Sequence, residues 1–242
     1  LLQVGANFAN DVFDFERGAD NADRLGPQRA TQQGWITAAQ MKRAMWLAFA
    51  GAAVIGFYLT WVAGWPVLAL GLASIAAAYL YTGGPKPYGY LGLGDLAVFV
   101  FFGFGAVAGT YYVQAHAVSP LAWLASVPIG ALATAILVVN NLRDIETDAR
   151  AGKNTLAVRL GDRPTRTYYL ILLAVAYLVP LLLWLRGLAG PWALLSWLSL
   201  PLALQVAQRM RHESGLALNG CLVLTARLEV VFGLLFALGL AW

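Results

Sequence analysis

Two short stretches of the sequence carry carboxylate and amide side chains at the spacing of one helical turn. In the first, the oxygen-bearing side chains are Asn7, Asn10, Asp11, Asp14 and Asp20. In the second, they are Asn140, Asn141, Asp144 and Asp148. On an α-helix, residues three or four positions apart lie on one face. Each stretch, if helical, therefore presents several oxygen atoms together.

Oxygen ligands from Asp and Asn suit a hard cation such as Mg²⁺, which commonly bridges a few carboxylates to the phosphates of a substrate. Basic residues accompany both stretches and could bind the remaining charge of a diphosphate; they are Arg24, Arg29, Arg143, Lys153 and Arg159. The simpler alternative is two solvated helix ends whose Asp residues are matched by nearby Arg. Two copies with the same spacing, each beside a basic cluster, favour the diphosphate site.

The elements that position these stretches must lie in a membrane. Hydrophobic residues make up 60% of the 242 residues and charged residues only 12%, whereas soluble domains carry about 25% charged residues. A net charge of only +4 gives no reason to expect a nucleic-acid surface. The composition therefore predicts an all-α integral membrane protein, with the bilayer as its solvent.

A spanning helix needs about 20 mostly apolar residues. Candidate spans lie at roughly 44–63, 65–83, 93–115, 119–142, 166–186, 189–208 and 216–242. The segment Leu1–Phe15 has the pattern of a helix already under way, which brings the visible total to about eight. We therefore expect further residues upstream, including at least one more span.

The loops between these spans alternate between basic and uncharged, and every second loop holds most of the Lys and Arg residues. Basic loops are cytoplasmic by the positive-inside rule. Both polar stretches lie at this side of the membrane. The sequence thus predicts a site that faces the cytoplasm, in a bacterial inner membrane.

The wording of the two stretches resembles the UbiA superfamily of intramembrane prenyltransferases. Residues 10–14 resemble its N-D-x-x-D motif and residues 144–148 its D-x-x-x-D motif. The longer pattern N-N-x-R-D-I-x-x-D-x-x-A-G-K-x-T-L-A-V-R-L-G, from Asn140 to Gly161, is most similar to the 1,4-dihydroxy-2-naphthoate polyprenyltransferases of menaquinone synthesis. The loop from Tyr81 to Asp95 is also similar to the loop of that branch.

The resemblance implies one domain over residues 1–242, with nine transmembrane helices around a central cavity. It also implies two related halves, with motif one near 7–29 and motif two near 140–161. Two Mg²⁺ ions would be held on the prenyl diphosphate by Asn10, Asp11, Asp14, Asp144 and Asp148. The sequence departs from the superfamily twice: Gly18 stands where a further Asp is frequent, and Lys86 follows Tyr81 by five residues instead of four.

The candidate site follows from the motifs and the resemblance together. The residues assigned to catalysis are Asp11, Asp14, Asp144, Asp148 and Arg143. Those assigned to the diphosphate are Asn10, Arg24, Lys86, Lys153 and Arg159. Secondary candidates are Asn7, Asp20, Asn140, Asn141, Tyr81 and Asp95. The expected reaction transfers a polyprenyl group from its diphosphate to 1,4-dihydroxy-2-naphthoate with loss of CO₂, giving a demethylmenaquinone.

Two other interpretations stay open at this point. The acceptor could be another aromatic compound, such as 4-hydroxybenzoate or homogentisate, or the prenyl group could be phytyl, as in phylloquinone synthesis. A transporter of organic anions or divalent cations is a different class of protein. A transporter would need charged groups near the middle of the bilayer, whereas the charges here gather at cytoplasmic helix ends.

Overall fold

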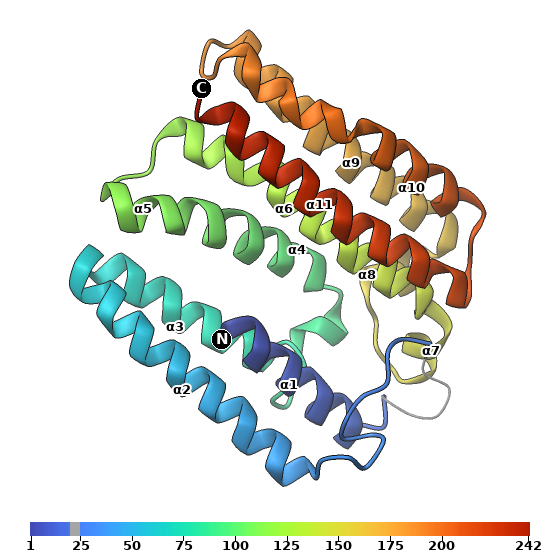
Figure 1. Cartoon of the computed structure of the whole chain (residues 1–242). Coiled ribbons are helices and arrows are strands. Elements are labelled where there is room, and N and C mark those ends of the chain that lie inside the picture. Colours follow the sequence, from blue (N-terminus) through green and yellow to red (C-terminus); the bar gives the residue numbers. More distant parts are fainter. Residues whose placement is uncertain (20–24) are drawn as a thin grey trace. The chain divides into compact units, whose positions relative to one another are not determined.

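The structure is a computed structural model that describes residues 1–19 and 25–242, and all regular elements within these residues are helices (Figure 1). The predicted all-α fold is confirmed. The chain divides into two compact units: residues 1–94 with 144–159 form unit 1, and residues 95–143 with 160–242 form unit 2. The prediction of one domain with two related halves stays a prediction.

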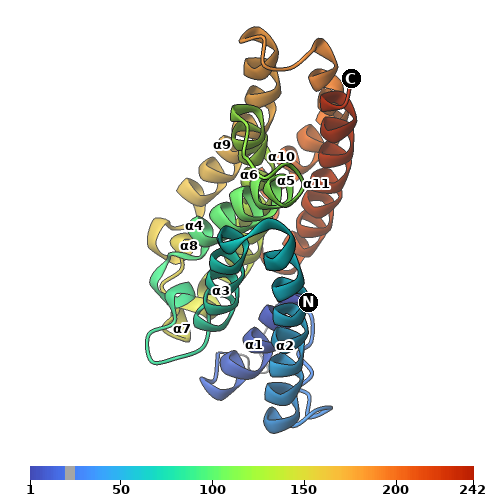
Figure 2. The same cartoon turned by 90° about the vertical axis from the view of Figure 1, so that its left-hand side faces the viewer.

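Unit 1 is built on three helices that contact one another: α1 (Leu2–Glu16), α2 (Ala38–Ala63) and α3 (Trp65–Leu80). Both views show α1 and α2 next to each other (Figures 1 and 2). Ala9, Met45 and Phe49 form the small core between them. A capping box starts α2, and the backbone of Gly64, at φ +86°, turns the chain from α2 into α3.

Two connecting segments complete unit 1. The segment after α3 contains the 3₁₀-helix η1 (Tyr88–Leu91), and residues 144–159 contain α7 (Ile145–Arg150) and most of α8 (Leu156–Leu160). The backbone N–H of Asn154 donates to the carbonyl of Tyr90 at 3.0 Å. This bond joins the two segments, although about 60 residues separate them in the sequence.

Unit 2 is arranged around α6 (Pro120–Arg143), which contacts η2, α9 and α11. The other helices of the unit are α4 (Gly94–Val98), the π-helix η2 (Phe99–Ala108), α5 (Gly109–Ala115), α9 (Asp162–Leu185), the 3₁₀-helices η3 (Pro191–Ser199) and η4 (Gly215–Ala217), α10 (Leu200–His212) and α11 (Leu218–Leu240). A Cβ atom on Gly103 would lie 2.9 Å from the Cα of Gly130. The two glycines therefore permit η2 and α6 to pack with their backbones in contact.

Five stretches of the described residues are long and apolar enough to cross a membrane: Ala38–Ala63, Gly94–Ala115, Pro120–Arg143, Asp162–Leu185 and Gly215–Leu240. The span predicted at 65–83 forms the shorter helix α3, which has 16 residues. The span predicted at 189–208 is divided into η3 and α10 at Leu200. Pro201 lies in the first turn of α10, where its missing N–H leaves no helical bond unmade.

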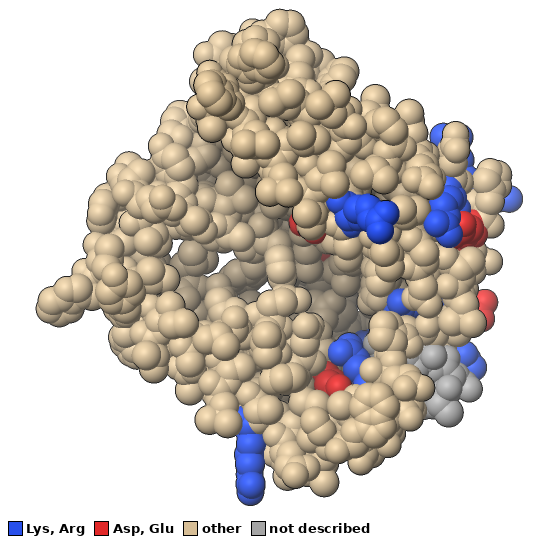
Figure 3. Space-filling model, in the orientation of Figure 1, with Lys and Arg blue, Asp and Glu red and all other residues tan. Residues whose placement is uncertain are grey.

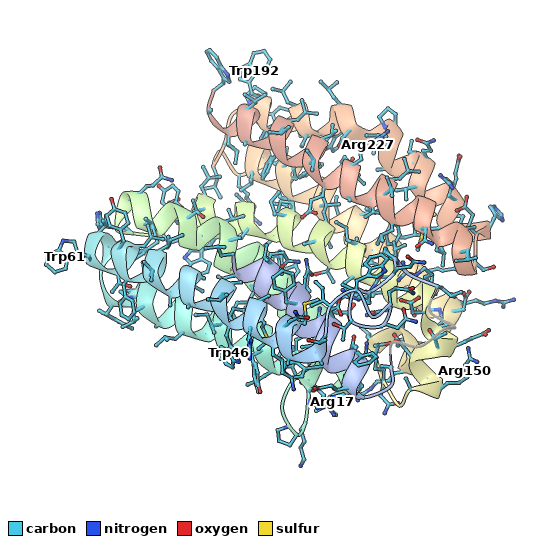
Figure 4. The ribbon with its side chains drawn as sticks, turned by 60° about the horizontal axis from the view of Figure 1, so that its bottom comes forward. Arg17, Trp46, Trp61, Arg150, Trp192 and Arg227 are labelled. Atoms are coloured by element: carbon cyan, nitrogen blue, oxygen red, sulfur yellow. The ribbon has the colours of Figure 1, made fainter. Side chains whose placement is uncertain are left out.

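The outer faces of these helices are covered with exposed apolar side chains. On α2, Leu47 is 74% exposed and Trp61 is 91% exposed. Figure 3 shows few charged residues on the visible surface, and Figure 4 shows Trp61 and Trp192 projecting outward. Soluble proteins rarely expose this much apolar surface, except where they contact a membrane or a partner protein. Together with the spans, it is the surface of an integral membrane protein.

Candidate functional site

The last two turns of α1 bury two carboxylates, Asp11 and Asp14, whose exposed fractions are 7% and 3%. Both oxygen atoms of Asp11 accept hydrogen bonds from the loop that follows α1. The N–H of Ala30 donates at 3.0 Å and the N–H of Thr31 at 3.1 Å. The carboxylate thus fixes the course of this loop over the end of the helix.

Asp14 is held from the two other polar segments of unit 1. The hydroxyl of Tyr90, in η1, donates to Oδ1 of Asp14 at 2.8 Å. The ammonium of Lys153, in the segment after α7, donates to Oδ2 at 2.9 Å. The Lys153 nitrogen also lies 5.0 Å from the centroid of the Tyr90 ring. Asp14 of motif one therefore contacts Lys153 of motif two and Tyr90 of the loop between the two motifs.

Gly18 ends the helix of motif one. Its backbone has φ +72°, its N–H donates to the carbonyl of Phe15 at 3.0 Å, and the N–H of Ala19 donates to the carbonyl of Asp14 at 2.9 Å. This pair of bonds is a Schellman motif, which usually places glycine at the position with positive φ. The departure from the superfamily pattern at Gly18 thus has a structural reason here, because glycine adopts this φ without the steric cost of a Cβ.

Motif two ends in the same way. Gly152 has φ +72°, its N–H donates to the carbonyl of Ala149 at 3.2 Å, and the N–H of Lys153 donates to the carbonyl of Asp148 at 2.9 Å. Asp14 and Asp148 therefore occupy the same position, four residues before the glycine of a Schellman motif. The bond from Lys153 to Asp148 also fixes the backbone from which the Lys153 side chain reaches Asp14.

Motif two does not lie on one continuous helix. The helix α6 ends at Arg143, and α7 begins at Ile145. Between them, Asp144 has φ −97° and ψ 11°, and its carbonyl accepts from the N–H of Asp148 at 2.7 Å as the first bond of α7. Since the helix is interrupted at Asp144, Asn140 and Asn141 do not share a single helical face with Asp148.

The loop after α3 is tied to motif one by polar contacts. Thr82 donates through Oγ1 to Oδ1 of Asn10 at 3.0 Å. Arg17, just past the end of α1 (Figure 4), donates to the carbonyl of Thr82 at 3.2 Å and to that of Gly84. Lys86, predicted to bind diphosphate, is exposed on this loop. Arg17 rather than Lys86 is therefore the basic residue that positions the loop against α1.

Tyr81 and Tyr88 pack edge to face in the same loop, with ring centroids 5.4 Å apart. The Tyr88 hydroxyl donates to the carbonyl of Ala77 at 2.8 Å, and burial raises the pKa of Tyr88 to about 12. A Cβ atom on Gly89 would lie 2.7 Å from the Tyr81 carbonyl. This close approach allows η1 to turn back and direct Tyr90 toward Asp14.

The other predicted site residues of unit 1 differ in their exposure. Asp144 and Asp148 are half-buried, and Asn7 is exposed on α1. Arg159 is exposed, and its side chain donates to the carbonyl of Asn154 at 3.2 Å. Asp20 and Arg24 lie outside the described residues.

Four predicted residues belong to unit 2. Arg143 is 3% exposed and donates to Oδ1 of Asn140 at 2.6 Å and to Oδ1 of Asn219 at 2.7 Å. Asn141 and Asp95 are also buried. Within this unit the Arg143 guanidinium thus connects α6 to α11.

Sequence reasoning missed the roles of Tyr90, Thr82, Arg17 and Asn219. Tyr90 and Thr82 lie within the loop whose wording resembles the naphthoate branch, but their types alone do not reveal a contact with α1. Arg17 directly follows motif one and was counted only as a basic loop residue. Asn219 is a polar residue at the start of an apolar span, which is the kind of signal that could have identified it.

The donor chemistry at the end of α1 fits a hard cation. Asp11 and Asp14 offer oxygen atoms only, and each carboxylate oxygen has more than one acceptor site. Among residues 1–19 and 25–242, no group of three or more His, Cys, Asp or Glu side chains could hold a metal ion. Mg²⁺ is usually bound through one or two carboxylates together with substrate phosphates. The residues therefore fit an ion that binds with a diphosphate, and do not fit a cage made of protein ligands alone.

Comparison with known proteins decides the family. The model of the UbiA prenyltransferase family matches residues 1–241. The chain belongs to this family. The prediction of an aromatic prenyltransferase is thereby confirmed at the level of the enzyme class, and UbiA-family prenyltransferases generally depend on a divalent metal.

Curated relatives within the UbiA family share close to half of the residues. A 1,4-dihydroxy-2-naphthoate octaprenyltransferase of Haemophilus influenzae is 48% identical over 74% of this chain and 60% of the relative's length. The protein of the same name from Escherichia coli is 42% identical over 99% of the chain and 80% of its own length. The protein of the same name from Mycobacterium tuberculosis is 47% identical over 88% of this chain and 72% of its own length.

Proposed function

We propose that this UbiA-family chain transfers a polyprenyl group from its diphosphate to 1,4-dihydroxy-2-naphthoate, with Mg²⁺ bound at motifs one and two. The carrying observation is that Lys153, from motif two, forms an ion pair with buried Asp14, from motif one. An ammonium and a carboxylate from the two motifs thus already lie together at one place in unit 1. The names of the relatives support the acceptor.

The assigned roles follow from charge. Asn10, Asp11, Asp14, Asp144 and Asp148 would hold two Mg²⁺ ions on the diphosphate. When bound, the metal neutralises negative charge that develops on the leaving diphosphate. Lys153 would move its ammonium from Asp14 to a phosphate oxygen, where a charge-assisted hydrogen bond is strong. Arg159, on the same segment, and Arg24 would add positive charge near the phosphates.

The reaction then breaks the allylic C–O bond of the donor, and the electron pair leaves with the diphosphate. The aromatic ring attacks the allylic carbon through the ring carbon that bears the carboxylate. The new C–C bond forms as the carboxylate leaves as CO₂, and its electron pair restores the aromatic ring. The product is the demethylmenaquinone skeleton in its reduced, quinol form. No redox partner is needed for this step.

The basic loops support a cytoplasmic position of motifs one and two by the positive-inside rule, in what we propose is a bacterial inner membrane. Donor and product are polyprenyl lipids, which would enter and leave through the bilayer. Lys153 and a cation held by Asp14 would bind the diphosphate of the donor, and neither group selects the acceptor. Another aromatic acceptor is therefore an outcome that the experiment must distinguish.

The test is transfer of a radiolabelled prenyl group by the purified full-length protein, with either Mg²⁺ or EDTA. Dihydroxynaphthoate and 4-hydroxybenzoate are offered in parallel, and CO₂ release is followed from carboxyl-labelled naphthoate. We expect Mg²⁺-dependent product and equal CO₂ from the naphthoate. Product from 4-hydroxybenzoate alone would contradict the acceptor, and full activity in EDTA would contradict the metal.

A further inference from the structure

We propose that Tyr90 is a positioning residue for the diphosphate site: its hydroxyl orients the Asp14 carboxylate toward the metal when Lys153 leaves that carboxylate for the diphosphate. This inference rests on the proposed function at the same two motifs. It adds a role for a residue of the loop between them.

The first support is that the two oxygen atoms of Asp14 accept hydrogen bonds from different side chains. These partners are the Tyr90 hydroxyl at 2.8 Å and the Lys153 ammonium at 2.9 Å. If the ammonium moves to a phosphate, one oxygen becomes available to a cation while the other stays fixed. A carboxylate that is held at one oxygen presents its second oxygen in a defined direction, as ligands supported by outer hydrogen bonds do at metal sites.

The second support is the contact of the Tyr90 ring with cations. The Lys153 nitrogen lies 5.0 Å from the ring centroid, and the Arg17 guanidinium carbon lies 5.6 Å from it. Both distances lie within the range of cation–π attraction. The ring thus gives the Lys153 ammonium a second favourable neighbour near Asp14, so the side chain can shift without losing every partner.

The third support is that the backbone of Tyr90 is fixed independently of its hydroxyl. The carbonyl of Tyr90 accepts from the N–H of Asn154, next to Lys153, at 3.0 Å. The N–H of Tyr90 donates to the carbonyl of Pro87 at 3.1 Å. Replacing the tyrosine with phenylalanine therefore removes the hydroxyl that donates to Asp14 and keeps the aromatic ring and these two backbone bonds.

The same loop provides a matched control. The hydroxyl of Tyr88, two residues earlier in η1, also makes a hydrogen bond of 2.8 Å, but to the backbone carbonyl of Ala77. Tyr88→Phe and Tyr90→Phe thus remove equal chemical groups from one 3₁₀-helix. Only the second removes a contact with a motif carboxylate, so a difference between the variants reports on Asp14.

The experiment measures metal binding without turnover. Wild type, Tyr90→Phe and Tyr88→Phe are purified as full-length protein and titrated with Mn²⁺, a spectroscopic substitute for Mg²⁺. Binding is followed by electron paramagnetic resonance in the presence of a non-reactive farnesyl thiodiphosphate and no acceptor. Prenyl transfer with increasing Mg²⁺ is measured on the same preparations.

We expect Tyr90→Phe to need about tenfold more Mn²⁺ than wild type, or more, in line with the loss of a hydrogen bond to a charged group. Its turnover should recover at high Mg²⁺, and Tyr88→Phe should stay within about twofold of wild type. Equal Mn²⁺ affinities of Tyr90→Phe and Tyr88→Phe would overturn the role of Tyr90. So would a wild type that binds no Mn²⁺ with the analogue.

The two readouts separate this inference from the proposed function. Because the Mn²⁺ titration contains no acceptor, a shift in Tyr90→Phe supports the inference even if dihydroxynaphthoate is not the acceptor. Conversely, Mg²⁺-dependent transfer to the naphthoate with no shift in Tyr90→Phe would overturn the inference and leave the proposed function standing.

Discussion

The ends of the two motif helices are built alike. Asp14 and Asp148 each lie four residues before a glycine at φ +72°, and that glycine and the residue after it close a Schellman motif. The helices before them differ. Motif one completes the 15-residue helix α1, whereas motif two is interrupted at Asp144 and continues in the six-residue helix α7.

The turn at the end of each motif has the same backbone geometry, but the residue that follows the glycine differs. The residue after the glycine is Ala19 in motif one and Lys153 in motif two. The matching turns fix the backbone, and this one position then differs in chemistry. Only Lys153 has a side chain long enough to reach across to the other motif, so the second copy supplies the cation and the first supplies the buried carboxylates.

The largest expected effect comes from neutralising the carboxylate at the equivalent position of each motif. In Asp14→Asn and Asp148→Asn, we expect turnover to fall by a factor of about 10² or more. Each substitution removes a negative charge that would hold Mg²⁺, which stabilises the transition state. Initial rates of prenyl transfer measure the effect. If Asp148→Asn kept wild-type turnover, the two motifs would not be functionally equivalent.

Removing the cation that joins the motifs should have the next largest effect. Lys153→Met keeps the approximate length and the apolar part of the side chain but removes its ion pair with Asp14. The hydrogen bond from Tyr90 to Asp14 is kept. We expect the KM for prenyl diphosphate to rise about tenfold to a hundredfold, as for the loss of a charge-assisted bond. Arg43→Met, at an exposed position of α2 outside the predicted site, serves as the control. A larger effect from Arg43→Met would contradict the assignment of Lys153.

Glycine substitutions test whether the two turns are equivalent in structure and different in function. Gly18→Ala and Gly152→Ala each force a Cβ into a positive φ, at a cost of about 1–2 kcal/mol in the free energy of unfolding. Because a Cβ on either residue would have no atom within 4 Å, the strain should be the same. Denaturant unfolding in detergent measures it.

Activity should separate these two glycine variants. Gly152→Ala shifts the turn from which Lys153 extends, so it should lose more turnover than Gly18→Ala at equal stability. An equal loss of activity in both variants would mean that the position of the Lys153 backbone does not matter.

The smallest effect is expected away from the motifs, at the pair of Arg209 and Glu213. Its nitrogen and oxygen atoms are 2.5 Å apart, and the hydrogen bond from Arg209 lowers the pKa of Glu213 from its ordinary value. A lowered pKa stabilises the folded state at pH values above the pKa of the unfolded chain. That contribution is lost as the pH falls through the folded pKa. Since both side chains are partly exposed, the effect is small.

Unfolding curves of Glu213→Gln and wild type between pH 3 and pH 7 check this. We expect a slightly lower stability of the variant at pH 7 and convergence of the two at pH 3, with turnover at pH 7 unchanged. A loss of turnover comparable to that of Asp14→Asn would show that residues outside the two motifs also belong to the site.

The sequence was informative where physical chemistry acts locally. Hydropathy identified the helices because lipid requires long apolar segments, and motif spacing identified Asp11 and Asp14 because a helix repeats every three to four residues. The break at Asp144 was not visible, since no Pro or Gly marks it. The contact between Lys153 and Asp14 joins residues 139 positions apart, and no local pattern encodes such a pairing.

The loop contacts show the same limit. The sequence of residues 81–95 resembles one branch of the family, but it does not predict the hydrogen bond from Thr82 to Asn10 or that from Tyr90 to Asp14. The helix-ending role of Gly18 could have been predicted, because glycine commonly follows the last turn of a helix. Side-chain chemistry alone indicates only a missing ligand at this position.

The central claim is that motifs one and two bind one diphosphate together with a cation. The most direct test is equilibrium binding of a radiolabelled, non-reactive prenyl thiodiphosphate to wild type, Asp14→Asn and Asp148→Asn, with and without Mg²⁺. We predict that Mg²⁺ strengthens binding to wild type and that either substitution removes most of this gain. If Mg²⁺ strengthened binding to Asp148→Asn as much as to wild type, the claim of a joint site would be contradicted.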